Sequence, residues 1–382
     1  MNNKRISWLD GLRGFACLMI FLHHFMVGFF PSSYYGSIVG SHGNCGWDTC
    51  LSQHPISVII NGNFWVCVFC LLSGLVQSYK IFNLENVDIV SSDMVKRYFR
   101  LSLPVFFVSL VVYFLMRGEL FFNANLSDDV GSPWLATYYL DKVPIRAVFE
   151  TSFVSVWLNG DSTFSNAFWM LTIIFFGSYL TYILALIAKG KDSRIVILLS
   201  LVALLFYQKN NYYICFVGGV IIAYFLAYGN NDYKYKTFFG VISLIIGMFL
   251  GGYPSGVAPT NIYRYFQHFS LDIIHVFGAI LFVLGICNLR LITKFLEKKS
   301  LLWLGKISFG VFLVHIPIIF SIGTYSFMKI YNYSGRYQFS AFSSLGISLV
   351  TTIFCAWLFN RYVEKLCGII TTKIIGWFKL IV

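Results

Sequence analysis

The sequence predicts an all-α integral membrane protein with about ten transmembrane helices and with both the N- and C-termini in the cytoplasm. Of its 382 residues, 58% are hydrophobic and 12% are charged, whereas a typical soluble domain carries about 25% charged residues. Long apolar runs follow one another with only short polar breaks. Lys and Arg gather in alternate breaks between these runs. These observations exclude a soluble globular protein.

Ten apolar runs approach the roughly 20 residues that cross the hydrocarbon core of a bilayer. The first run is interrupted by His23 and His24 and lacks a small-residue cleavage site, so we expect it to remain as a helix and not to be removed as a signal peptide. The fifth and seventh runs meet the length requirement only marginally. The predicted spans are residues 14–31, 62–79, 103–116, 168–188, 195–208, 212–228, 237–252, 270–288, 301–326 and 341–360.

The basic residues support this topology, because Lys and Arg collect on the cytoplasmic side of a membrane. With a cytoplasmic N-terminus and ten spans, 21 of the 28 Lys and Arg residues fall inside and 7 fall outside. Topology therefore accounts for the net charge of +12, and the expected partner is the lipid bilayer and not a nucleic acid. We expect residues 1–365 to form one membrane domain and the basic, apolar residues 366–382 to lie on the inner membrane surface.

Two of the nine cysteines differ from the rest in their surroundings. Seven lie in or beside predicted helices and are expected to be small buried hydrophobic residues. Cys45 and Cys50 lie in the first extracytoplasmic connection, where a disulfide and two free thiols are equally compatible with the sequence. His42 and His54 flank them, but the spacing matches no common zinc pattern, and we expect no metal site.

The longest connection, residues 117–167, combines acidic side chains with tryptophans and tyrosines. Carboxylates and aromatic rings together can hold a sugar through hydrogen bonds and stacking. The plainer interpretation is an interfacial segment whose aromatic rings lie at the level of the lipid headgroups. Both interpretations place this connection outside the membrane core.

The first predicted helix carries ionisable side chains where hydrocarbon disfavours them. Asp10 is well placed to cap the helix, and Arg13 would lie in its first turn. His24 follows eleven residues later, about 16 Å deeper and within about 20° of the same face. His23 points about 80° away, which suits a hydrogen bond between helices. His24 could act as a buried general base or could serve the same structural purpose.

The segment "LDGLRGFACLMIFLHH" resembles the opening signature of the acyltransferase-3 family, which are integral membrane enzymes that move acyl groups, commonly acetyl. The Leu-Asp-Gly-Leu-Arg-Gly run is matched. The family's spacing of ten residues between an arginine and a histidine is matched by Arg13 and His24. The resemblance implies that His24 is catalytic and that Arg13 acts beside it, with Asp10 near the same cavity.

Further matches follow in the family's order and extend the resemblance over essentially the whole chain. "FWVCVFCLLSGLVQSY" carries Ser73 in a second-helix motif, and "KRYFRLSLP" carries the Arg-x-x-Arg motif as Arg97 and Arg100. "WLGKISFGVFLVH" resembles a late motif through Ser308 and His315, which share a helix face and either line the same cavity or pair with each other. Phe312 replaces its usual tyrosine.

One position departs from the family pattern. The segment "FWMLTIIFFGSYL" keeps Trp169 but has Ile174 where members often carry a glutamate. Glu150, Asp161 and Asp272 are conceivable substitutes, and the sequence does not select among them. A divergent or inactive member is compatible with this change.

The cluster of Lys96, Arg97 and Arg100 fits the donor that the resemblance implies, which is cytoplasmic acetyl-CoA or another acyl-CoA. The i, i+3 spacing directs both arginines to one side of the helix, and arginine binds phosphate in a bidentate manner. The alternative role is ordinary topology-setting charge, but the flanking motifs favour phosphate binding. No tightly bound cofactor is expected.

The resemblance implies an O-acetyltransferase of a bacterial inner membrane that modifies a cell-surface polysaccharide or its lipid-linked precursor. His24 would act as the base or would carry the acyl group itself. An acyltransferase acting on a small molecule is one alternative. A proton-coupled transporter that uses intramembrane His and Arg is another, and a structural role in surface-polymer assembly is a third.

Overall fold

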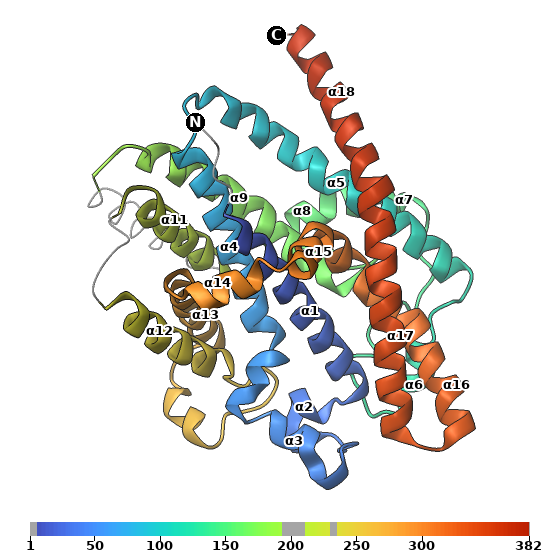
Figure 1. The fold of residues 1–382 in the computed structure, drawn as a ribbon. Coiled ribbons are helices and arrows are strands. Elements are labelled where there is room, and N and C mark those ends of the chain that lie inside the picture. The colour runs from blue at the N-terminus through green and yellow to red at the C-terminus, as the bar shows by residue number, and fades with distance from the viewer. Residues whose placement is uncertain (1–5, 193–210, 230–234, 382) are drawn as a thin grey trace. The chain divides into compact units, whose positions relative to one another are not determined.

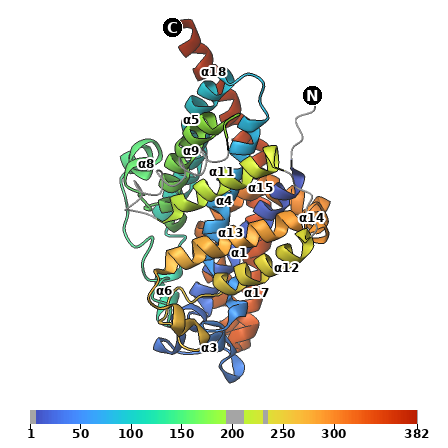
Figure 2. The ribbon, with the colours of Figure 1, turned by 90° about the vertical axis from the view of Figure 1, so that its left-hand side faces the viewer.

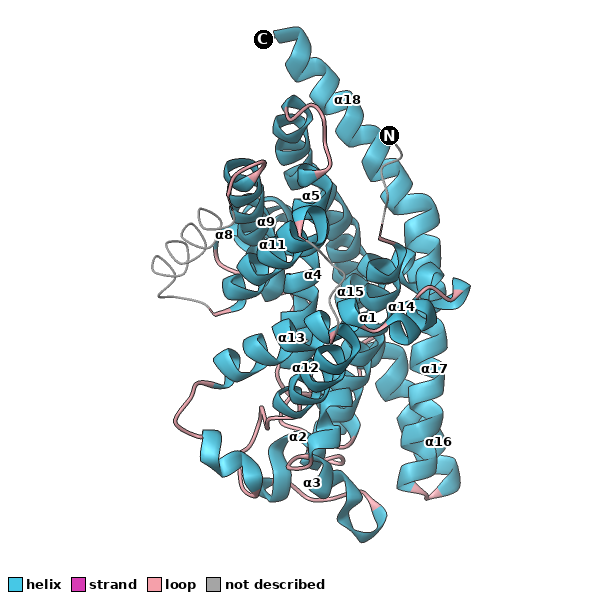
Figure 3. Cartoon of the chain, turned by 60° about the vertical axis from the view of Figure 1, so that its left-hand side comes forward, coloured by secondary structure: helices cyan, strands magenta, loops and turns pink. Residues whose placement is uncertain are grey.

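The computed structural model describes residues 6–192, 211–229 and 235–381, and in these ranges the regular secondary structure is helical throughout (Figure 3). The chain divides into two compact units that alternate along the sequence. The first comprises Met1–Ile20, Gln53–Met94 and Ile173–Lys306, and the second comprises Phe21–Ser52, Val95–Thr172 and Ile307–Val382. Four long helices therefore begin in one unit and end in the other.

The first unit contains the long apolar helices of the middle of the chain (Figure 1). Helix α4 packs against α11, and α12 packs against α13. Helices α12 and α13 lie side by side along most of the length of α12 (Figure 2). This unit contains the beginnings of α1 and α15 and most of α9. Its elements are α1 (Ser7–Phe29), η3 (Pro55–Ile59), α4 (Gly62–Phe82), α9 (Trp169–Ala188), α11 (Tyr212–Tyr228), α12 (Lys236–Gly251), η6 (Ile262–Phe266), α13 (Leu271–Asn288), α14 (Arg290–Leu296) and α15 (Lys299–Ile318).

The second unit contains the remainder of α1 and α15, most of α5, and the long connections. Two junctions between its C-terminal helices are wider π-helical turns, at residues 319–323 and 359–364, and Gly335 and Arg336 form the turn between the two helical runs. Its further elements are α2 (Ser32–Tyr35), η1 (Gly36–Ile38), η2 (Asn44–Gly46), α3 (Trp47–Leu51), α5 (Asp88–Arg117), α6 (Asn123–Ser127), α7 (Arg146–Glu150), η4 (Thr151–Ser155), α8 (Val156–Leu158), η5 (Asn166–Phe168), η7 (Ile319–Gly323), α16 (Thr324–Ser334), α17 (Tyr337–Leu358), η8 (Phe359–Glu364) and α18 (Lys365–Ile381).

The helical membrane architecture predicted from the sequence is confirmed in its main feature. Within the described ranges, seven helical segments are long and apolar enough to cross a bilayer, and α11 and α12 are shorter apolar helices. The predicted span 195–208 lies outside the described residues. The count of ten spans, the cytoplasmic termini and the division at residue 365 stay predictions. Residues 337–376 form one apolar helical segment.

Two predicted boundaries were wrong because polar residues extend the helices beyond their apolar parts. Helix α1 begins at Ser7, so Asp10 lies inside its first turn and does not precede the helix as a cap. Helix α5 begins at Asp88, 15 residues before the predicted span at 103. Hydropathy locates the segment within the hydrocarbon, whereas backbone hydrogen bonding continues into the interface.

The glycines of two sequence motifs bring the start of α1 into backbone contact with α15. A Cβ atom added to Gly305 would lie 2.0 Å from the carbonyl oxygen of Asp10, and one added to Gly14 would lie 2.5 Å from the nitrogen of Gly305. Small residues allow this approach, which is common where membrane helices pack. The two glycine motifs are therefore packing determinants within the first unit.

The long connections of the second unit are held by buried polar side chains. Asn123 donates from Nδ2 to the carbonyl oxygens of Leu135 (2.7 Å) and Tyr138 (2.8 Å). Ser132 donates to the carbonyl oxygen of Val27 at 2.9 Å, which fixes the same connection to α1. The segment around Trp134 is thereby anchored over the end of α1.

Candidate functional site

The structure joins two histidines that the sequence places in different motifs. His24, in the second half of α1, is half-buried, whereas His315 in α15 is 1% exposed. The Nε2 atom of His315 lies 3.2 Å from Nδ1 of His24. We call His24 and His315 the histidine pair. The two roles expected for Ser308 and His315 stay predictions.

The other ring nitrogen of His315 is fixed by its own helix. Its Nδ1 atom lies 3.0 Å from the carbonyl oxygen of Val311 and 2.8 Å from that of Phe312. The helix then widens into the π-helix η7 after Pro317, whose ring interrupts normal helical bonding. Ser321 donates to the carbonyl oxygen of Pro317 at 2.6 Å, and this bond stabilises the wider turn beside the pair.

An aromatic side chain from the long connection lies over His24. The rings of Trp134 and His24 have centroids 5.4 Å apart and planes tilted by 31°, and Trp134 also lies 4.6 Å from the ring of Phe320. Gly28 lies directly under this indole, and a Cβ atom there would make an ordinary van der Waals contact with it at 3.5 Å. The sequence did not indicate this position of Trp134, although the Gly-Ser-Pro turn before it was a signal of a fixed loop.

His23 lies beside both the histidine pair and the short helix α2. Its ring lies 5.5 Å from that of Tyr34 and 5.0 Å from that of His24, at angles of 70° and 71°. The separate roles expected for His23 and His24 stay predictions.

Arg13 and Asp10 form a pair within the first turns of α1. The Nη1 atom of Arg13 lies 3.5 Å from Oδ1 of Asp10, and both side chains are partly exposed. Asp10 therefore forms an i, i+3 ion pair inside the helix, whereas the sequence predicts that it caps the helix. Arg13 and His24 belong to one continuous helix, so about 16 Å of axial rise separates them.

The basic cluster lies in α5, before the apolar part of that helix. Arg100 is exposed, and Lys96 and Arg97 are half-buried. Tyr98, between them, donates from its hydroxyl to the carbonyl oxygen of Phe153 at 2.6 Å, which anchors this part of α5. Since the segment is helical, the two arginines share a side as the sequence predicts.

The remaining predicted site residues have diverse surroundings. Ser73 donates to the carbonyl oxygen of Phe69 at 3.0 Å, Trp169 is 37% exposed at the start of α9, and Ser308 is buried. Cys45 and Cys50 are free, exposed thiols in this structure. Their disulfide stays a prediction for oxidising conditions.

Asp161, one of the substitutes considered for the absent glutamate, organises its own connection. It accepts hydrogen bonds from the hydroxyls of Thr151, Ser155 and Thr163, at 2.5 to 2.6 Å, and from the backbone nitrogen of Thr163 at 2.9 Å. Burial acts to raise the pKa of this carboxyl, but these donors outweigh it and hold the pKa below its usual value. Its carboxylate is therefore bound as a structural acceptor.

The other two carboxylates considered as substitutes have unlike settings. Glu150 is exposed at the end of α7. Asp272 belongs to the first unit, where it accepts a hydrogen bond from Nδ2 of Asn63 at 3.1 Å. At the glutamate position itself, Ile174 is buried.

Apolar helices that can cross a bilayer, together with a hydrogen-bonded pair of one buried and one half-buried imidazole, define a multi-pass membrane protein with a candidate proton-transfer site. Residues 6–361 match the model of acyltransferase family 3, described as an acyltransferase domain. The protein therefore belongs to the acyltransferase-3 family, and this confirms the resemblance found in the sequence.

One relative gives a more specific similarity over a shorter stretch. The chain is 26% identical over 147 residues to the O-acetyltransferase PaAT-1 of Phomopsis amygdali. This alignment covers 36% of the present chain and 28% of that protein. No solved structure matches the chain.

Proposed function

We propose that the protein is a membrane-bound O-acyltransferase that moves acetyl from cytoplasmic acetyl-CoA to a hydroxyl of a cell-surface polysaccharide or its lipid-linked precursor, in a bacterial inner membrane. Family membership supports acyl transfer, and the relative from Phomopsis amygdali supports acetyl transfer to oxygen. The single observation that carries the mechanism is the hydrogen bond between His24 and His315.

The contacts of His315 determine which nitrogen of His24 can accept a proton. Two carbonyl oxygens lie at Nδ1 of His315 and can only accept, so this nitrogen must carry the hydrogen. A wholly buried ring is most stable uncharged, which leaves Nε2 of His315 as an acceptor. Nδ1 of His24 must then donate to it, and Nε2 of His24 carries the lone pair. His315 is thus a positioning residue that holds His24 in the form of a base.

The reaction follows from this proton arrangement. Nε2 of His24 takes the proton of the acceptor hydroxyl while the hydroxyl oxygen forms a bond to the carbonyl carbon of the thioester. The carbon–sulfur bond then breaks, and the leaving thiolate receives the proton from His24. The products are an O-acetyl ester and free CoA, and His24 returns to its original form.

The donor is expected to bind through the phosphates of CoA to Arg97 and Arg100, with Lys96 contributing charge. Guanidinium groups on one side of a helix can bind phosphate oxygens in pairs. Arg13 would orient the donor from its own turn of α1, since about 16 Å of axial rise separates it from His24. Salt should weaken donor binding because it screens these charges.

The proposal is tested by measuring transfer of labelled acetyl from acetyl-CoA to membrane glycans in cells with and without the protein. We expect His24→Ala to abolish transfer and His23→Ala to reduce it much less. Equal loss in both variants would contradict the assignment of His24. A proton flux that depends on His24, without any transfer by the wild type, would support a transporter instead.

A matched pair of variants tests the donor site. We expect the double variant Arg97→Gln and Arg100→Gln to raise the apparent KM for acetyl-CoA. Arg117→Gln removes one exposed charge from the other end of α5 and should leave this KM unchanged. An unchanged KM in the double variant would show that these arginines do not bind the donor and act only as topology-setting charges.

A further inference from the structure

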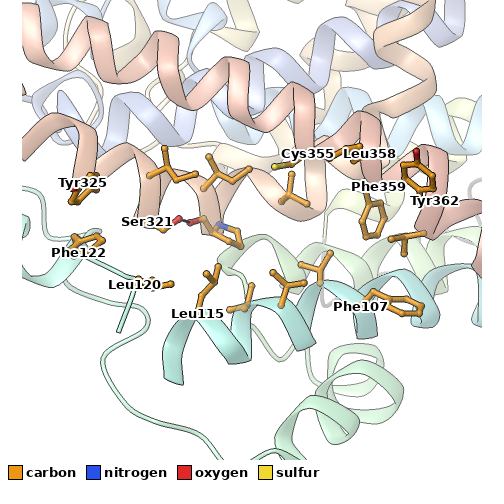
Figure 4. A pocket seen from close by; sticks show the side chains of 18 residues that line it. Phe107, Leu115, Leu120, Phe122, Ser321, Tyr325, Cys355, Leu358, Phe359 and Tyr362 are labelled. Atoms are coloured by element: carbon orange, nitrogen blue, oxygen red, sulfur yellow. Dashed lines mark hydrogen bonds between the residues drawn. The ribbon is translucent and has the colours of Figure 1, made fainter. Parts of the chain in front are cut away.

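An apolar groove of about 910 Å³ lies within the second unit, and its lining includes Val314 and Pro317, which are close to His315 along α15 (Figure 4). One wall is α5, and the facing walls come from the run α15–η7–α16 and from the junction of α17 with η8. Phe122 and Tyr325 lie at one end, and Phe107 and Tyr362 lie at the other. All three walls belong to helical segments that are long and apolar enough to span a bilayer.

The lining of this groove cannot bind a polar substrate. It contains no charged side chain, and its one aliphatic hydroxyl, on Ser321, already donates to the carbonyl oxygen of Pro317. A sugar or the phosphates of CoA would lose their hydrogen bonds to water without replacement. Hydrocarbon has no such cost, and it gains the dispersion contacts that an empty groove would lack.

The groove has the length and the opening that a lipid chain requires. Val314 and Tyr325 both line it and are eleven residues apart, which corresponds to about 16 Å along a helix. One leaflet contributes about half of the roughly 30 Å hydrocarbon core. Val111 on one wall is 59% exposed and Tyr362 on another is 60% exposed, so the groove opens laterally to the membrane.

The charges at the two ends differ. At one end, the guanidinium of Arg361 lies 5.6 Å from the ring of Tyr362 and 5.5 Å from that of Trp357. These aromatic faces hold a cation at the mouth of the groove. The neighbouring Glu364 accepts a hydrogen bond at Oε2 from Asn360 at 2.7 Å, whereas its Oε1 is buried without a hydrogen-bond partner among the described residues.

The other end is less suited to an anion. Lys329 lies 5.5 Å from the ring of Tyr325, but an ammonium group lacks the planar, two-point geometry with which guanidinium binds phosphate. A carboxylate, that of Glu119, also precedes the lining residue Leu120, and it is paired with Lys142 at 2.6 Å. The Arg361 end is therefore the better site for a phosphate.

We propose that the groove is a binding site for one acyl chain of an anionic phospholipid, whose phosphate lies at Arg361. The chain fills the groove toward Phe122 and Tyr325, and the headgroup remains at the membrane interface. Lipid binding in this groove does not require acyl transfer by the protein.

The test is lipid retention by the purified full-length protein. The protein is placed in vesicles of equal parts phosphatidylglycerol and phosphatidylcholine, extracted with mild detergent, and analysed for bound lipid by native mass spectrometry. We expect one retained phosphatidylglycerol per chain. Val111→Trp should fill the groove and remove most of this lipid, whereas Val350→Trp, at a 69% exposed position of α17 outside the lining, should not.

A second pair of variants tests the headgroup end. Arg361→Gln should reduce the preference for phosphatidylglycerol over phosphatidylcholine roughly tenfold, as expected for a charge-assisted hydrogen bond, and Lys329→Gln should change it little. The proposal is overturned by the reverse order of these variants, by absence of retained lipid in the wild type, or by equal retention in both tryptophan variants. Retention of a polyprenyl lipid from host membranes in place of phosphatidylglycerol would also overturn it.

Discussion

Replacing His315 separates its positioning role from the base itself. In His315→Leu, Nδ1 of His24 loses the acceptor that lies 3.2 Å away. A hydrogen bond of this kind contributes about 0.5–1.5 kcal/mol, which corresponds to up to about tenfold in the fraction of His24 with its lone pair on Nε2. Misorientation of the freed ring adds to this effect. We expect kcat to fall roughly 10- to 100-fold.

The base variant sets the scale for comparison. His24→Ala should lower kcat by about 10²–10⁴, the usual contribution of a general base. The assay is transfer of labelled acetyl from acetyl-CoA, with kcat and the KM for acetyl-CoA determined separately. We expect His315→Leu to change kcat while the KM for acetyl-CoA stays near the wild-type value, because the proposed donor contacts are on α5.

Two controls distinguish positioning from general disruption of the fold. His315→Gln provides a side-chain oxygen that can accept from Nδ1 of His24, so it should recover part of the lost kcat. In the His315→Ala background, a histidine methylated at Nδ1 can be incorporated at position 24. Methylation fixes the lone pair of this ring on Nε2, as the bond to His315 is proposed to do in the wild type. This protein should be more active than His315→Ala with ordinary histidine.

A folded His315→Leu variant with wild-type kcat would contradict the tautomer assigned to His24. The same conclusion follows if the methylated histidine gives no gain over His315→Ala, since the lone pair on Nε2 would then be irrelevant. Thermal unfolding of each variant in detergent establishes that the comparison is made between folded proteins.

Three further variants or conditions test other parts of the structure. Gly305→Ala should lower the free energy of unfolding by about 1–3 kcal/mol, because the added Cβ atom overlaps the backbone of α1, and the thermal midpoint should fall. Gly346→Ala is the control, since a Cβ atom there meets nothing within 4 Å. A similar loss of stability in both variants would contradict the close approach of α1 and α15. The hydrogen bonds that lower the pKa of Asp161 also stabilise the connection around it. This stabilisation is fully present above the ordinary carboxyl pKa of about 3.9, and it is lost as the pH falls through the lowered pKa of Asp161. Hydrogen exchange of residues 146–165 should therefore rise below about pH 4, and Asp161→Asn should already raise it roughly tenfold at neutral pH; unchanged exchange in that variant would contradict the structural role. Cys45 and Cys50 should become linked in protein taken from oxidising conditions if their connection is extracytoplasmic, and two free thiols in mass spectrometry of non-reduced peptides would remove this prediction.

The sequence alone determined the features that depend on neighbours along the chain. Hydropathy was sufficient to predict a helical membrane protein, because a backbone in hydrocarbon must satisfy its own hydrogen bonds. Helical periodicity placed Arg97 and Arg100 on one side of α5 and separated His23 from His24. The motifs around Arg13 and His24 were sufficient to indicate the family that the whole-chain match then confirmed.

Only the tertiary structure decided which side chains meet across helices. His24 and His315 are 291 residues apart, and no periodicity within either helix specifies that they are hydrogen-bonded. The position of Trp134 over His24 is fixed by the bond from Ser132 to Val27, which is a contact between separate segments. Helix starts also escaped prediction, since the first turns of α1 ("SWLD") and α5 ("DIVSSD") mix polar and apolar side chains and precede the long apolar runs. Side-chain pairing across segments is determined by packing, and hydropathy along one segment does not encode it.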